Sequence, residues 1–107
     1  MDIDGILALA ANFTVTGTSD IDGTLAIGAT TYDANGTFDA TNGTVDFTAA
    51  GTLKLGSTVT SLGALDDAEG TVEYDQSSGF SASILADSYN NLTSNIIPKA
   101  SWLDISP

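Results

Sequence analysis

Apolar and polar residues alternate along most of the chain. Near the start, every second residue is apolar: Leu7, Leu9, Ala11, Phe13 and Val15. Residues 44–48, 52–55 and 71–75 repeat the alternation over shorter stretches. A period of two is typical of strands that bury one face and leave the other in water. The pattern therefore predicts an all-β protein built from short strands.

Short repeated units separate these runs. A Gly-Thr-apolar triplet opens five of them, beginning at Gly23, Gly36, Gly43, Gly51 and Gly70. The triplets lie 13, 7, 8 and 19 residues apart, and residues 2–7 recur with one substitution at residues 20–25, eighteen positions later. Turns of about 18–20 residues, each with two or three strands, would match these units. They predict a β-solenoid of about five turns, in which each turn buries its apolar face by stacking on its neighbours.

An antiparallel β-sandwich is the alternative fold. Its strands recur every ~8–12 residues, and the irregular triplet spacing leaves this possibility open. Composition suits both folds, because the chain has 15 Thr and 11 Gly, and Asp supplies 12 of its 14 acidic residues. Threonine fits a pleated strand, whereas glycine and aspartate favour the turns between strands.

The chain divides into two parts. Residues 1–94 are predicted to form the β-repeat domain. Residues 95–107 are an apolar tail that holds Pro98 and the single Trp, Trp102. Because proline is confined to the edges of sheets, the tail is expected to cap the domain or to act as an assembly strand.

The net charge excludes several classes of partner. The chain carries 14 acidic residues and two lysines, which gives −12. Nucleic acids and anionic membrane surfaces attract basic proteins, so neither is an expected partner. No apolar run reaches the ~18 residues of a membrane helix, so membrane insertion is not expected.

The absence of two residue types from the sequence closes several catalytic routes. With no His and no Cys in the 107 residues, the Ser-His-Asp and Cys-His mechanisms lack a base or a nucleophile. The preferred ligands of zinc are missing as well. Asp66, Asp67 and Glu69 form the densest acidic group. We interpret it as a solvated turn, and a pair of glycosidase carboxylates is the alternative. The chain is therefore not expected to be an enzyme.

Calcium binding is the candidate site chemistry. Asp2, Asp4, Asp20 and Asp22 form two Asp-x-Asp-Gly units one predicted turn apart. Residues on successive turns lie about 5 Å apart, so stacking would gather four carboxylates that repel one another unless a cation or water separates them. Calcium prefers such oxygen ligands. These four residues are the predicted metal ligands, and two solvated Asp-Gly turns are the alternative.

A family resemblance covers roughly residues 20–93. Residues 42–48, 51–63, 70–75 and 88–93 resemble repeats of large cell-surface and adhesin-like proteins of Bacteroidetes-type bacteria. The resemblance implies a secreted, repetitive, β-rich protein that serves in surface layers, adhesion or fibres. The chain departs from that pattern after Ser94, and the family supplies no catalytic residues to carry over.

These observations lead to two expectations of function. The first is an extracellular structural or adhesive protein, a fibre, matrix or surface-layer subunit that assembles with copies of itself by β-strand stacking or augmentation. The second is a calcium-dependent module that binds surface polysaccharide. Ice binding through rows of threonine is not expected, because the Thr residues show no repeat at the predicted turn length.

Overall fold

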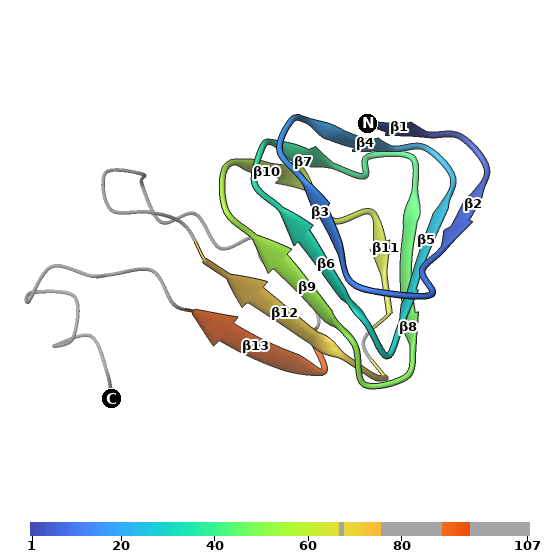
Figure 1. Ribbon diagram of the computed structural model, residues 1–107, viewed down its shortest axis with the longest axis vertical. Helices are drawn as coiled ribbons and strands as arrows, with labels where there is room; N and C mark the ends of the chain where they lie inside the picture. The colour runs from blue at the N-terminus through green and yellow to red at the C-terminus, as the bar shows by residue number, and fades with distance from the viewer. Residues whose placement is uncertain (67, 76–88, 95–107) are drawn as a thin grey trace, which may run out of the picture.

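A computed structural model of the chain describes residues 1–66, 68–75 and 89–94 (Figure 1). Every secondary-structure element in these ranges is a β-strand, and every strand pairing is parallel. The strands form three sheets that wind around one core as a β-solenoid of about four turns. The predicted solenoid is confirmed, and the antiparallel sandwich is wrong because no described pair of strands is antiparallel.

Each complete turn of the solenoid, here called a rung, contributes one strand to each sheet, and sheet C has one further strand among the described residues. Sheet A contains β1 (Asp2–Ile3), β4 (Ser19–Ile21), β7 (Phe38–Asp39) and β10 (Val59–Ser61). Sheet B contains β2 (Ile6–Ala8), β5 (Thr24–Gly28), β8 (Thr44–Thr48) and β11 (Ala64–Leu65). Sheet C contains β3 (Phe13–Val15), β6 (Thr31–Ala34), β9 (Thr52–Leu55), β12 (Thr71–Tyr74) and β13 (Asn91–Ser94).

The three-sided rung explains the irregular triplet spacing. Gly36 precedes β7 of sheet A, Gly23 and Gly43 precede strands of sheet B, and Gly51 and Gly70 precede strands of sheet C. The triplets therefore stand at three different corners of the rung. Stacked residues are 18 positions apart from Asp2 to Asp20 and 21 apart from Phe38 to Val59. The predicted turn length was nearly right, with three strands in each turn.

Apolar side chains stack in interior columns, one residue from each rung. In sheet B the column is Leu7, Leu25, Val45 and Leu65. In sheet C it is Phe13, Tyr32, Leu53, Val72 and Leu92. The middle members of both columns are almost fully buried. Burying such a side chain contributes ~1.5–3 kcal/mol, so most of the stabilisation depends on neighbouring rungs.

Glycine is required at corners where two rungs touch. A Cβ on Gly43 would lie 2.3 Å from the Ile21 carbonyl oxygen of the rung before it. Gly70 has φ +79°, and a Cβ there would lie 2.2 Å from the Phe47 ring. Residues with a side chain would clash at both positions, which accounts for the glycine that begins each of these triplets.

The last described strand, β13, ends at Ser94, which is also the last residue that the structure describes, so the predicted boundary between residues 94 and 95 stays a prediction. The predicted tail, residues 95–107, lies outside the described residues. In the part of the chain that the structure describes, no helix has the length and apolar character needed to cross a membrane.

Candidate functional site

Three of the four predicted calcium ligands lie together at the first rungs of sheet A. The pairing of β1 with β4 places Asp2 beside Asp20, and Asp22 follows the end of β4. Carboxylate oxygens of Asp2, Asp20 and Asp22 lie within 4.8 Å of one another. We call these three residues the Asp cluster. Asp4 is not a member, although it stands near enough to influence Asp22 electrostatically.

The strand pattern and the corner direct these carboxylates outward. Ile3 and Ile21 are buried and stack on each other, so the alternating Asp2 and Asp20 face the outside of sheet A. At the corner, the Ile3 carbonyl oxygen accepts backbone hydrogen bonds from Asp22 (2.8 Å) and Gly23 (2.9 Å). This turn closes the Asp-x-Asp-Gly unit and fixes Asp22 beside the rung that precedes it.

The Asp cluster concentrates negative charge. Desolvation raises the pKa of the Asp22 carboxyl, and the charges of Asp20, Asp2, Asp4 and Asp39 raise it further. Like charges disfavour the ionised form of a carboxyl, and a bound cation would reverse that effect. The arrangement is therefore suited to a hard cation, with water supplying the remaining oxygen ligands that calcium takes.

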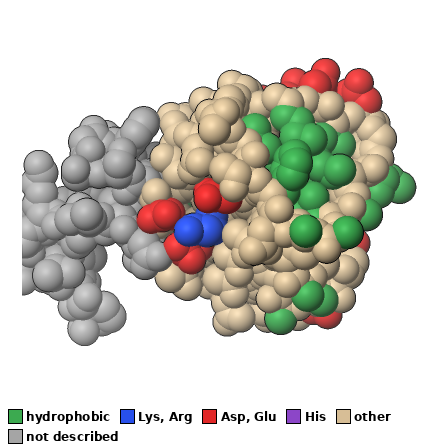
Figure 2. Space-filling view, viewed as in Figure 1, with side chains coloured by type: hydrophobic (Ala, Val, Ile, Leu, Met, Phe, Trp, Pro, Cys, Tyr) green, Lys and Arg blue, Asp and Glu red, His purple; other side chains and the backbone are tan. Residues whose placement is uncertain are grey.

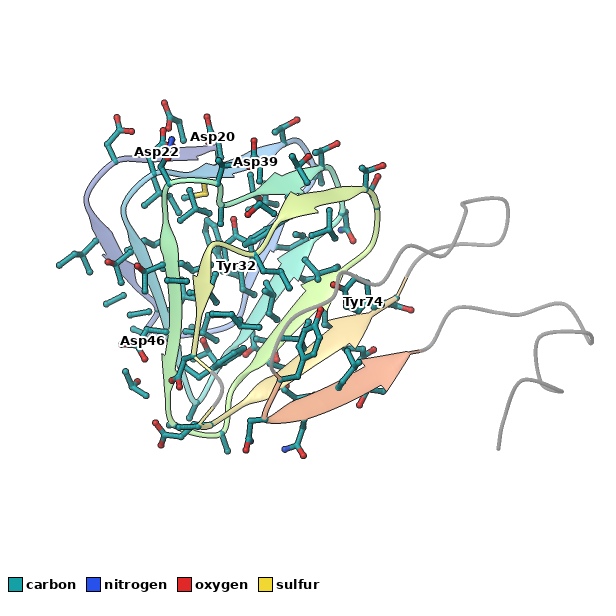
Figure 3. All side chains as sticks on the ribbon, turned by 180° about the vertical axis from the view of Figure 1, so that it is seen from behind. Asp20, Asp22, Tyr32, Asp39, Asp46 and Tyr74 are labelled. Carbon is teal, nitrogen blue, oxygen red and sulfur yellow. The ribbon has the colours of Figure 1, made fainter. Side chains whose placement is uncertain are left out.

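The sequence reasoning missed Asp39. It is paired with Asp20 in sheet A, so Asp2, Asp20 and Asp39 stack in register on three successive rungs. Figure 3 shows Asp20, Asp22 and Asp39 along one end of the molecule. The side chain of Asp39 accepts hydrogen bonds from the backbone NH and the hydroxyl of Thr41. The 19-residue spacing from Asp20 was a usable signal, but the Asp-x-Asp-Gly motif is absent there.

The second acidic group forms a turn. Carboxylate oxygens of Asp66 accept hydrogen bonds from the backbone NH of Ala68 at 2.9 Å and of Phe47 at 3.3 Å. The first of these bonds has the largest effect in lowering the pKa of the Asp66 carboxyl. A glycosidase acid needs a raised pKa, so Asp66 fits the turn interpretation. Glu69 is exposed, and Asp67 lies outside the described residues.

The outer face of sheet C corrects the expectation about threonine rows. Thr31, Thr52 and Thr71 stack in register on successive rungs, so threonine does repeat at the length of a turn. The sequence reasoning missed this column because the spacing changes from 21 to 19 residues. The parallel column two residues on is charged, with Asp33, Lys54 and Glu73 in register. Figure 2 shows the basic side chain among acidic ones.

The open strand edges form another candidate site. Among the described residues, β1, β2 and β3 each pair on one side only, and so do β10, β11 and β13. The apolar side chains at these ends are the exposed ones: Ile6 at 78%, Met1 at 44%, Phe13 at 37% and Leu92 at 45%. Figure 2 shows apolar side chains gathered over β2 and β3. Such edges can accept a further strand.

Comparisons with protein-family models, with curated proteins and with solved structures find no match for this chain. The resemblance to Bacteroidetes-type surface repeats therefore stays a prediction. The strand edges and the Asp cluster are the features from which a function can be argued.

Proposed function

We propose that this chain is an extracellular structural or adhesive subunit that assembles with copies of itself by β-strand stacking. The observation that carries the proposal is the exposure of apolar side chains at the ends of the solenoid. Phe13 and Leu92 are exposed, whereas Tyr32, Leu53 and Val72 between them in the same column are almost fully buried. One more rung at either end would bury these terminal residues.

The physical basis is the unpaired backbone of the edge strands. An open parallel edge presents NH and C=O groups that pair readily with another strand. At the first rung the open edges of β1, β2 and β3 lie on three sides of the core, and at the other end β13 extends sheet C one strand beyond β10 and β11. Pairing between copies would repeat the contacts that already hold successive rungs together. We infer a role in a fibre, matrix or surface layer, without catalysis.

Microscopy with a light-scattering measurement tests the proposal. Purified protein is concentrated in ~0.15 M salt, where charge repulsion beyond about 8 Å is screened. We expect filaments in negative-stain images and scattering that rises with protein concentration. Protein that stays monomeric by sedimentation at every concentration, while its circular dichroism reports folded β-structure, would contradict self-assembly.

Calcium-dependent binding of surface polysaccharide is the second candidate. It is favoured by the Asp cluster, whose three carboxylates lie within 4.8 Å of one another. A ligand that binds only the folded state raises stability by about 2.7 kcal/mol at one hundred times its Kd. Calcium should then raise Tm, and Asp20→Asn should abolish the increase because it removes one of the three carboxylates, the one paired with Asp2.

Asp33→Asn is the matched control for Asp20→Asn. Asp33 also faces outward on a strand of the solenoid, but its neighbour one rung on is Lys54 and not another carboxylate. The control should keep the full calcium effect. An unchanged Tm of the parent protein in millimolar calcium, or an equal shift in the Asp20→Asn variant, would exclude the Asp cluster as the calcium site.

A further inference from the structure

We propose that the junction between copies is made by sheet C, with β3 of one copy pairing in parallel with β13 of the next. This inference rests on the proposed self-assembly and specifies its contact and direction. Among the described residues sheet C has the most strands, and its order runs from β13 through β12, β9 and β6 to β3. Its two edges lie at opposite ends of the sheet in Figure 1, so one copy can offer both partners.

The register within sheet C predicts which residues would meet. Each strand aligns with its neighbour through the same interior column, which begins at Phe13 and ends at Leu92. Continuing that alignment across the junction places Phe13 of one copy beside Leu92 of another. Both are exposed in the single chain. Their contact would bury apolar surface at ~25 cal/mol for each Å² removed from water.

The neighbouring positions also match in chemistry. In the same register Thr14 faces Thr93, and Asn12 faces Asn91. Thr14 and Thr93 are exposed, and neither pair carries a charge. Asn12 already bridges two rungs, because its Oδ1 atom accepts a hydrogen bond from the Thr31 backbone NH at 3.0 Å. Stacked threonines and asparagines are favourable cross-strand neighbours.

Charge favours this head-to-tail direction over a head-to-head contact. Two copies that met through their first rungs would bring two Asp clusters to one interface, together with the exposed carboxylate of Asp4. Repulsion among so many carboxylates would oppose that contact. The β3–β13 pairing keeps the clusters of successive copies a full chain apart. A contact between different surfaces builds an open filament when its geometry closes no ring, and stacking copies along the solenoid axis closes none.

Cysteine cross-linking tests the junction directly, because the natural sequence has no cysteine. Neighbouring positions in paired strands lie about 4.8 Å apart, within the Cα separation that a disulfide spans. We expect a mixture of the Thr14→Cys and Thr93→Cys proteins to form a mixed disulfide dimer under mild oxidation. Each variant alone should stay uncross-linked. Dimers of Thr14→Cys alone, or no mixed dimer from assembled protein, would overturn the proposed junction.

A charge-pair experiment covers the case in which cysteine disturbs assembly. Thr14→Lys stands beside Asp33 and Thr93→Lys beside Glu73 in the single chain, so both substitutions should be tolerated. At the junction, however, the two lysines would face each other. The double lysine variant should lose assembly, and each single lysine variant, whose lysine would face an uncharged threonine at the junction, should keep it. Filaments of the double lysine variant equal to those of the parent would contradict the junction while leaving self-assembly intact. A parent protein that forms no filaments would contradict self-assembly itself.

Discussion

Ser19 and Tyr32 are buried polar residues inside an otherwise apolar core. The Ser19 Oγ and Tyr32 Oη atoms lie 2.8 Å apart, and both residues have no exposed surface. The pair joins sheet A to sheet C across the solenoid. Phe13 and Phe38 pack on the Tyr32 ring, with centroids at 5.9 and 6.1 Å. A buried hydroxyl without a hydrogen-bond partner at this position would lower the free energy of unfolding, relative to an apolar side chain of the same shape.

We expect the free-energy costs of substituting Ser19 and Tyr32 to be non-additive. Tyr32→Phe and Ser19→Ala each leave the partner hydroxyl without its buried bond, at a cost of about 1–3 kcal/mol. The double variant should cost less than the sum of the two, since no orphan hydroxyl remains. Urea unfolding measures all three. Additive effects would show that the hydroxyl pair is not coupled.

The same pair predicts a loss of stability at alkaline pH. Burial raises the pKa of the Tyr32 hydroxyl above its ordinary value of 10.0, and the hydrogen bond with Ser19 partly opposes the change. A raised folded-state pKa means that the stabilisation is present below pH 10 and is lost as the pH rises through the folded value. Tyr32→Phe removes this contribution, so its unfolding free energy should fall less between pH 9 and pH 11 than that of the parent.

Thr48 has a backbone conformation that suits glycine. Its φ is 55°, and it is paired with Gly28 of the preceding rung, whose φ is 66°. A β-branched residue at positive φ is strained by roughly 1–2 kcal/mol. Thr48→Gly should therefore raise the free energy of unfolding by about 1 kcal/mol. Thr44→Gly is the control, because Thr44 lies in the same strand but has no positive φ. This substitution should lower the free energy of unfolding. A decrease in both variants would contradict strain at Thr48.

At the scale of the elements, alternation was enough to predict short β-strands that bury one face. The repeat length was predictable too, because Asp2 and Asp20 lie in identical local sequences. The arrangement of the strands in three sheets was not predictable, because the same Gly-Thr triplet stands at different corners of the rung. The corner that each triplet occupies is known only from the register of the paired strands, such as β4 with β7 or β6 with β9. The spacing of the triplets in the sequence does not give that register.

The Asp cluster was predictable in part for the same reason. The recurring Asp-x-Asp-Gly unit predicts that Asp2 and Asp20 lie side by side. Asp22 joins them because it stands at the corner after β4. Asp39 belongs to the same column, but it follows Phe38 and precedes Ala40, so its surroundings do not repeat the motif. Its place beside Asp20 depends on the register of β4 with β7.

Lys54 links the acidic side chains on the outside of sheet C. It stands between Asp33 and Glu73 in register, and its Nζ atom lies 3.6 Å from an Asp75 carboxylate oxygen. Lys54→Met keeps the side-chain length and removes the charge. Because the site is partly exposed, the cost should be about 0.5–1 kcal/mol at low salt.

Salt separates the charge effect from lost packing. The destabilisation by Lys54→Met should shrink in ~1 M NaCl, where the Debye length falls to about 3 Å. Urea unfolding at low and high salt measures the difference, with Lys54→Arg as the variant that keeps the charge. A cost that is unchanged by salt would mean that Lys54 acts through its aliphatic stem.

For the whole molecule, two opposing forces would govern the proposed assembly. The net charge of −12 makes copies repel one another at low ionic strength. Exposed apolar residues at the terminal rungs and unpaired strand edges favour contact at short range. Salt screens the first force and leaves the second almost unchanged, so the proposed assembly should strengthen as the ionic strength rises.

The axial repeat of the filaments tests head-to-tail stacking most directly. The described part of sheet C has five strands. Copies joined by β3 and β13 should therefore repeat every ~24 Å along the filament, with a strand spacing of about 4.8 Å. Electron diffraction or helical reconstruction measures both values. We predict this pair of spacings. A repeat near 48 Å, which alternating head-to-head and tail-to-tail contacts would give, or strands running along the filament axis, would contradict the account.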